Sequence, residues 1–247
     1  MSTAEADAND LGHLPEWDLG DLYSGTDSEE LKSDLEAAAV AASEFAKRYR
    51  GRIAEVSADD LGAAMATYEE LSETLGRVMS FAGLLHAGNV TDPEIGRFFQ
   101  NTQERVNAIT TELIFFSLEF NRLEEDDLAA KLEASGALAH YGPWLRDLRV
   151  FRPYQLADEL ETLLHEKEVA GRAAWVRLFD QTMAGLSFEI DGESVALEQA
   201  LHGLSDPDGD RRRVAAKEIG RVLESESALL TLITNTLAKD KEIEDRW

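Results

Sequence analysis

Apolar residues recur every three or four positions along most of the chain, which is the pattern of amphipathic helices. Two segments show it most clearly, one from Ala58 to Leu85 and one from Asp92 to about Leu123. Their apolar positions are Leu61, Met65, Tyr68, Leu71, Leu75, Val78, Phe81 and Leu85, then Ile95, Phe98, Val106, Ile109, Leu113, Phe116 and Phe120. Helices of this length, about 45 Å for 30 residues, are expected to pack antiparallel when short loops join them.

Small polar side chains mark where the predicted helices begin. The starts are a Thr-x-x-Glu capping box, a serine, and an aspartate followed by proline: Thr26 with Glu29, Ser57, and Asp92 with Pro93. The first helix is expected to reach about Arg50, before Gly51, and the second to end at Gly88 and Asn89. Shorter helices are predicted further on, at about 125–134, 137–149, 156–170 and 171–185.

One segment breaks the helical pattern. Between Ser187 and Leu197, Phe188 and Ile190 alternate with polar residues, and Asp191-Gly192 precedes a second short apolar run. Asp-Gly in this position predicts a hairpin, because its turn needs positive φ at both central residues. The polar loop 205–210 is expected to cap the helix after it. The sequence therefore predicts an all-α protein of mainly long antiparallel helices, with one small β-hairpin near 187–197.

The predicted elements divide the chain into three parts. Residues 1–13 are polar and are predicted to be disordered. Residues 14–186 are expected to form an N-terminal helical lobe. Residues 187–247 are expected to add the hairpin and further helices, with a soft boundary between the two groups near 186–205.

The last segment, Ser227 to Trp247, has the pattern of a helix with no terminating residue. Leu230, Ile233 and Leu237 fall on one face, and no Gly, Asn or Pro closes the segment. We interpret it as a helix truncated at Trp247, and the chain as the front part of a longer protein.

The composition narrows the classes of function. The 247 residues include 49 acidic and 24 basic side chains, a formal charge of −25, which disfavours nucleic acid and anionic membrane surfaces as partners. The simpler interpretation of this charge is that it keeps the protein soluble, as in a host with a high salt concentration. The functional alternative is that it attracts cationic peptides. The absence of cysteine excludes disulfides and thiolate chemistry. The N-terminus lacks a signal-peptide pattern and the longest apolar run is too short to cross a membrane, so we predict a cytoplasmic protein.

The candidates for metal or acid–base chemistry are five histidines: His13, His86, His140, His165 and His202. Two of them follow a glutamate by four residues, in the pairs Glu161/His165 and Glu198/His202. Structural ion pairing is the favoured interpretation. A carboxylate–histidine metal site is the alternative, although di-metal helical bundles use Glu-x-x-His at a spacing of three.

His165 also begins a near-match to the zinc-peptidase motif His-Glu-x-x-His, in which two imidazoles one turn apart hold the metal. Val169 stands where the second histidine would be, so the motif fails and Glu166 is expected to be a solvated helix residue.

Three other features have structural interpretations. The basic cluster Arg211–Arg213 is expected to pair with the acids of the preceding loop: Asp206, Asp208 and Asp210. Trp175, Val176 and Phe179 have the spacing of core residues. The chain has no Gly-rich phosphate loop and no Gly-x-Ser-x-Gly nucleophile elbow. The residues alone therefore predict no catalytic, cofactor-binding or metal site.

Four stretches together resemble the oligoendopeptidase F family of zinc metallopeptidases, relatives of thimet oligopeptidase. They occur in the family's order across nearly the whole chain: Trp17-Asp18-Leu19-Gly20-Asp21-Leu22-Tyr23, Gly171-Arg172-Ala173-Ala174-Trp175-Val176-Arg177-Leu178-Phe179-Asp180, Phe188-Glu189-Ile190-Asp191-Gly192, and Asn235-Thr236-Leu237-Ala238-Lys239-Asp240-Lys241.

The resemblance implies an α-rich, two-lobed peptidase whose channel admits short peptides and excludes folded proteins. The N-terminal part of the family forms the covering lobe, and residues 187–247 would begin the peptidase domain. The His-Glu-x-x-His helix, the third zinc ligand and the oxyanion-stabilising groups lie beyond the stretch that this sequence matches. The implied partners are short peptides and the catalytic part of the same protein, and zinc, held outside this chain, would activate the water that cleaves internal peptide bonds.

A second function class stays open beside the zinc oligoendopeptidase: a free-standing helical interaction module without catalysis. The sequence that follows Trp247 distinguishes the two. If the peptidase interpretation holds, this chain alone should retain no zinc and cleave no peptide, and it should expose apolar surface where the catalytic part docks.

Overall fold

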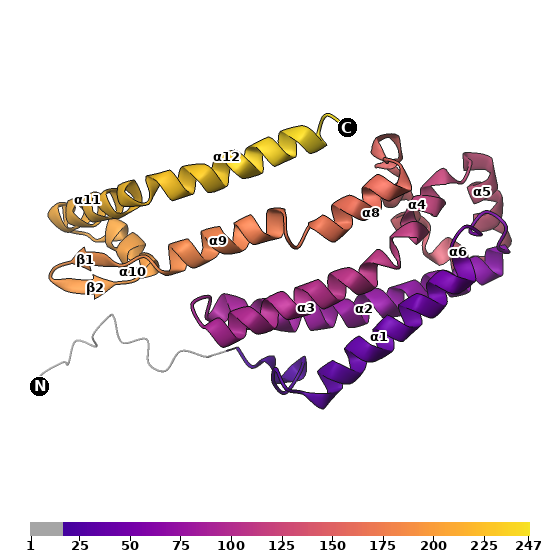
Figure 1. Cartoon of the computed structure of the whole chain (residues 1–247), viewed down its shortest axis with the longest axis horizontal. Coiled ribbons are helices and arrows are strands. Elements are labelled where there is room, and N and C mark those ends of the chain that lie inside the picture. Colours follow the sequence, from indigo (N-terminus) through magenta and orange to yellow (C-terminus); the bar gives the residue numbers. More distant parts are fainter. Residues whose placement is uncertain (1–16) are drawn as a thin grey trace, which may run out of the picture.

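The computed structural model describes residues 17–247, so the predicted disorder of residues 1–13 lies outside the described part. Helices dominate it, and their contacts divide them into two groups, with α8 drawn in line with α9 in Figure 1 but in contact with α3 and α4. The first group, called here the first bundle, contains α1 (Glu29–Tyr49), α2 (Ala58–Gly88), α3 (Pro93–Thr111), α4 (Ile114–Arg122), α5 (Glu125–Ala134), α6 (Gly136–His140), α7 (Gly142–Arg149) and α8 (Asp158–Lys167). The second group, the outer layer, contains α9 (Arg172–Ala184), β1 (Phe188–Ile190), β2 (Glu193–Val195), α10 (Leu197–His202), α11 (Gly209–Ser225) and α12 (Ser227–Glu244).

Short 3₁₀ turns connect or precede these elements, at Leu19–Asp21 (η1), Arg152–Tyr154 (η2) and Gly203–Ser205 (η3). The all-α fold with one hairpin is therefore as the sequence predicts.

The long helices α1, α2 and α3 contact one another, and the short connections between them make neighbours antiparallel, as predicted (Figure 1). The apolar stripe of α2 faces the core, with Leu61, Leu75, Val78 and Phe81 at most 3% exposed. Phe116 and Phe120 of α4 are fully buried against it. Aromatic burial at this scale is a main source of the hydrophobic stabilisation of the bundle.

Helix starts follow the predicted capping chemistry except at α1. The Ser57 hydroxyl accepts from the amide of Asp60 (3.2 Å), and the Asp92 carboxylate accepts from Glu94 (2.8 Å) and Ile95. In α1, however, Ser28 is the capping residue and accepts from Leu31 (3.4 Å), so the Thr26/Glu29 capping box is wrong. The polar stretch 26–29 offers several capping side chains, and their spacing alone does not choose among them.

The single helix predicted from Asp92 to Leu123 is also wrong, because it breaks into α3 and α4 at Glu112 and Leu113. The Arg50 guanidinium binds both the backbone carbonyl (3.0 Å) and the carboxylate (2.8 Å) of Glu112, so a contact from α1 holds the break. The turn also lets Phe115 and Phe116 both enter the core. Neither effect has a signature in the local sequence.

The segment predicted as one helix at 137–149 is divided as well. Helix α6 ends at His140, and α7 begins at Gly142 with Pro143 in its first turn, where a residue without an amide hydrogen costs no hydrogen bond. Helix α6 lies close to α2: a methyl group added at Gly62 would be 2.9 Å from Ala137 Cβ and 3.0 Å from the backbone nitrogen of Leu138.

The hairpin of the outer layer has the predicted form. Phe188 pairs with Val195 and Ile190 with Glu193, and the turn residues Asp191 and Gly192 have φ of 54° and 86°. Phe188 is fully buried with Ala200 and Val222 in a small core of its own. The hairpin therefore anchors α10 and α11.

The remainder of the outer layer is the pair α9 and α12, which contact each other and run side by side in Figure 1. Ile233 of α12 is buried, and Leu230 and Leu237 are half-buried, as their shared face predicts. In α9, Val176 and Phe179 are 38% and 41% exposed and Trp175 is half-buried, so their assignment to a core is wrong. The predicted boundary at 186/187 stays a prediction, although α9, which precedes it, contacts α12, which follows it.

Candidate functional site

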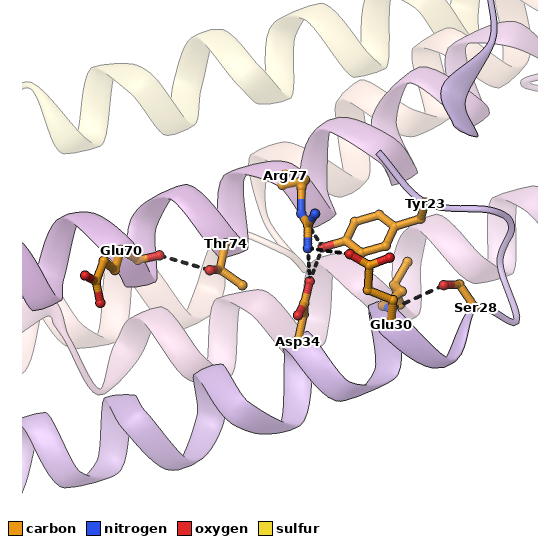
Figure 2. A network of polar contacts seen from close by, with 8 residues as sticks. Tyr23, Ser28, Glu30, Asp34, Glu70, Thr74 and Arg77 are labelled. Carbon is orange, nitrogen blue, oxygen red and sulfur yellow. Dashed lines mark hydrogen bonds and ion pairs between the residues drawn. The ribbon is translucent and has the colours of Figure 1, made fainter. Parts of the chain in front are cut away.

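The Trp17–Tyr23 segment is tied to the first bundle by a compact polar network (Figure 2). The Tyr23 hydroxyl donates to Asp34 Oδ2 (2.7 Å) and accepts from Arg77 Nε (3.0 Å), and the Arg77 guanidinium also pairs with Asp34 and with Glu30 (3.1 Å). Burial, followed by the hydrogen bond to Asp34, raises the pKa of Tyr23 to about 12. Because these groups satisfy one another, the network fixes the segment in place and leaves no group free for a ligand.

The structure places His165 against α3 and not against Glu161. Its Nε2 lies 2.8 Å from the Thr110 hydroxyl, and its backbone carbonyl accepts from Asn107. The Glu161 carboxylate instead accepts from the backbone amide of Leu156 (2.8 Å). The predicted Glu161/His165 ion pair is therefore wrong, because His165 binds α3 and Glu161 binds the backbone just before α8. Glu166 is exposed, as predicted.

The second predicted pair, Glu198/His202, is also wrong, since within residues 17–247 no ion pair joins these two exposed side chains. His140 packs its ring edge-on against Tyr141 at 5.0 Å, and His13 lies outside the described residues.

Two of the three arginines at the start of α11 pair with loop acids, as predicted, and the third binds the loop backbone. Arg211 pairs with Asp206 (3.6 Å), Arg213 pairs with Asp210, and Arg212 donates to the backbone carbonyls of Asp206 and Pro207. Asp208 caps the helix itself, accepting from the amide of Asp210 (2.8 Å). The cluster is therefore engaged in structural contacts.

Two large cavities lie beside the first bundle, and they differ in how their charges are used. The cavity between α1, α4 and α8 has a volume of about 640 Å³. Five of its charged side chains are bonded within the protein: Arg50 to Glu112 (2.8 Å), Arg122 to Asp158, and Glu119 to the backbone amides of Gly51 (2.6 Å) and Ile53 (3.3 Å). These bonds serve the local structure.

The second cavity, called here the α2–α9 cleft, lies between the first bundle and the outer layer and has a volume of about 850 Å³. The end of α2, the loop to α3, α3 itself, α9 and the start of α10 form its walls. Phe99, Val176, Met183 and Leu197 supply apolar lining. Its size is within the range of small-molecule and short-peptide sites.

One hydrogen bond between side chains crosses the cleft. Arg177 Nη1 of α9 donates to Gln103 Oε1 of α3 (2.7 Å), and Nη2 donates to the backbone carbonyl of Val169 (3.4 Å). The guanidinium thus has neutral acceptors and, among the described residues, no carboxylate partner. A partly buried arginine held by neutral groups keeps its charge available to a ligand.

His86 is the buried polar residue of the cleft. Its side chain is 6% exposed, its ring stacks on Phe99 at 4.7 Å, and its Nε2 has no hydrogen-bond partner among the described residues. The sequence analysis did not predict that His86 lines a cleft. The reason is that His86 extends the apolar stripe of α2, four residues after Ala82 and eight after Val78. That placement, an imidazole on a buried helical face, was the available signal.

The described residues contain no group of side chains suited to bind a metal ion. Within residues 17–247, no three His, Asp or Glu side chains come together in a way that could hold a metal ion. No helix in the same range is long and apolar enough to span a bilayer.

Comparison with known proteins finds one family model that matches part of the chain and solved structures of similar fold. The N-terminal family model of the M3 peptidases, described as oligopeptidase F, matches residues 119–188. The structure is similar to that of oligoendopeptidase-F from Enterococcus faecium, with a TM-score of 0.77 and 16% identity. The match covers 88% of this chain and 44% of that one, so the chain spans less than half the length of its structural relative.

These two matches confirm the resemblance to oligoendopeptidase F that the sequence carries. A chain from Chlamydophila abortus, provisionally assigned as a peptidase, is similar at a TM-score of 0.48 and 16% identity, over 92% of this chain and 39% of that one. No curated protein matches the chain.

Proposed function

We propose that this chain is the N-terminal part of a zinc-dependent oligoendopeptidase, which cleaves internal bonds of short peptides. The observation that carries the proposal is the likeness of its fold to oligoendopeptidase-F over 88% of the chain, together with the oligopeptidase F family model at residues 119–188. In this proposal the catalytic zinc is bound outside the chain, since the described residues bring no suitable ligands together.

The role of the chain is to shape and cover the substrate channel. Long helices that share an aromatic core suit such a lobe. Their close packing keeps the shape of the surface fixed without a bound ligand. The acidic surface would raise the local concentration of peptides with basic residues.

An exposed apolar patch supports docking to a catalytic part. Val150, Phe151 and Tyr154, in the turn between α7 and α8, are 63%, 67% and 78% exposed. Adjacent large apolar side chains with this exposure are typical of a surface that another element covers. We propose that the catalytic part of the same protein covers this patch.

The test compares this chain with the complete gene product. We expect the complete protein to cleave an internally quenched peptide and to lose that activity in a zinc chelator, whereas the purified chain neither cleaves the peptide nor retains zinc by elemental analysis. Chelator-sensitive cleavage by the chain alone, or a complete protein that cleaves no peptide, would overturn the proposal.

A further inference from the structure

Charged side chains of both signs line the α2–α9 cleft. Six ionisable groups line it, and within residues 17–247 none is in an ion pair: His86, Glu168, Arg172, Arg177, Asp180 and Glu198. The cavity beside α4 is the contrast, since its Arg50 and Arg122 both pair with carboxylates. In a chain with 49 acidic and 24 basic residues, unpaired arginines beside unpaired carboxylates mark a surface complementary to both signs of charge.

A second observation is the unsatisfied imidazole. His86 Nε2 is buried without a hydrogen-bond partner among the described residues, although the ring lines the cleft. Leaving a buried polar atom unpaired costs free energy, and a ligand that supplied the missing bond would recover it. The Gln103 amide, which already accepts from Arg177, adds a neutral polar group nearby.

The dimensions of the cleft set the size of the ligand. Its lining on α9 runs from Arg172 to Ala184, a rise of about 18 Å at 1.5 Å per residue. Arg172 and Asp180 are eight residues apart on that helix, which is about 12 Å. An extended chain advances about 3.3 Å per residue, so a tetrapeptide spans the same distance between its two termini.

We propose that the α2–α9 cleft binds a short peptide with free termini, with the carboxylate at Arg172 and Arg177 and the ammonium group at Asp180 and Glu198. The backbone of the peptide supplies the hydrogen bond that His86 lacks, and its side chains lie on Phe99 and Val176. This choice of ligand rests on the proposed peptidase function, and it assigns the binding of the peptide to residues of this chain.

The test is calorimetric titration of the 247-residue chain with tetraalanine and with its acetylated and amidated form. We expect saturable binding of the free peptide, in the millimolar range or tighter. Blocking both termini should weaken binding about tenfold or more, as expected for lost charge-assisted hydrogen bonds. The peptides blocked at one end only should fall between these two.

Arg172→Gln is the informative variant, because the Arg172 side chain makes no hydrogen bond or ion pair within the described residues, so the substitution breaks none. The variant should bind tetraalanine about tenfold more weakly than the parent chain does. Its affinity for the peptide with an amidated carboxyl end should be the same as that of the parent chain. Arg105→Gln is the matched control, an exposed arginine on α3 outside the cleft, and should bind as the parent chain does. Circular dichroism of each variant checks the fold.

Absence of saturable binding, equal affinity for the doubly blocked peptide, or unchanged binding by Arg172→Gln would each overturn the proposal. Its failure is distinguishable from failure of the proposed function. Peptide binding by this chain tests the cleft, while chelator-sensitive cleavage by the complete protein tests the peptidase activity.

Discussion

At the scale of single residues, one arginine joins three parts of the first bundle. Arg77 of α2 lies over the Tyr23 ring, with 4.6 Å between the guanidinium carbon and the ring centroid, and it pairs with Asp34 of α1. Tyr23 is 2% exposed, so the segment before α1 is held by a buried aromatic ring as well as by charge. The Arg77 side chain is 37% exposed, and solvent screening therefore limits what its ion pairs contribute.

Arg77→Ala should accordingly destabilise the chain by about 1–3 kcal/mol, the range for losing hydrogen bonds to charged groups, with the lower end favoured by solvent exposure. The measurement is the urea-unfolding midpoint with the slope unchanged. Arg97→Ala is the control. Arg97 pairs only with Glu94, three residues away on the exposed face of α3, and its loss should cost no more than about 0.5 kcal/mol. Equal effects of the two variants would refute the structural role of the network.

At the scale of elements, packing between α2 and α6 depends on a residue without a side chain. Gly62 allows the backbone of Ala137 and Leu138 to approach closely, whereas Gly76, on the same helix, has no neighbour within 4 Å of an added methyl group. The two glycines therefore make a matched pair in one helix, with opposite expectations for the same substitution.

Gly62→Ala should lower the free energy of unfolding by about 1–3 kcal/mol, as overpacking does. Gly76→Ala should raise it by about 0.5–1 kcal/mol, because alanine favours the helix over glycine. Chemical denaturation of both variants and of the parent chain measures these changes in the free energy of unfolding. A stabilising Gly62→Ala would show that α6 moves away at little cost and would contradict the close packing.

The elements also show which parts of the fold are local in sequence. The stripe of α2, the Ser57 and Asp92 caps and the Asp191-Gly192 turn depend on neighbours within one or two turns, and all three were predictable. The break at Glu112 was not, because Arg50 holds it from 62 residues away. The partner of His165 was not predictable for the same reason. The local spacing indicated Glu161, whereas the actual partner is Thr110 of α3, which is distant in sequence.

The candidate site was less predictable than the fold. The α2–α9 cleft combines Gln103, Arg177 and His86 from three helices, and nothing in their spacing joins them. The family resemblance predicted the kind of fold without predicting this cleft. A sequence pattern reports the face on which a residue lies, and it does not report which distant helix covers that face.

At the scale of the whole molecule, a formal charge of −25 acts against compactness. Many ion pairs in the described residues join neighbours three or four positions apart on exposed helical faces, such as Lys32 with Glu29 and Lys239 with Glu242. Such pairs are individually weak and do not offset the excess of negative charge.

Salt should therefore stabilise this protein. Raising the ionic strength from about 0.01 to 0.15 M shortens the screening length from about 30 to 8 Å, which weakens repulsion between distant carboxylates. We expect the thermal midpoint to rise by about 2–4 °C, equivalent to roughly 1 kcal/mol for a chain of this size. Near pH 4.5, the sequence pI, the same salt step should have little effect. A midpoint that falls with salt at pH 7 would show that attractive pairs outweigh the net charge.

The carboxylate of Glu119 has a consequence for how the chain folds as it is synthesised. It accepts hydrogen bonds from the backbone amides of Gly51 and Ile53, which lie in the connection between α1 and α2. Glu119 follows these two residues by 68 and 66 positions. Gly51 itself has φ of 77°, a conformation that local interactions do not impose on a growing chain. The connection between the first two helices thus receives these hydrogen bonds only after α2, α3 and most of α4 have been synthesised, so it becomes fixed later than its place near the start of the chain would indicate.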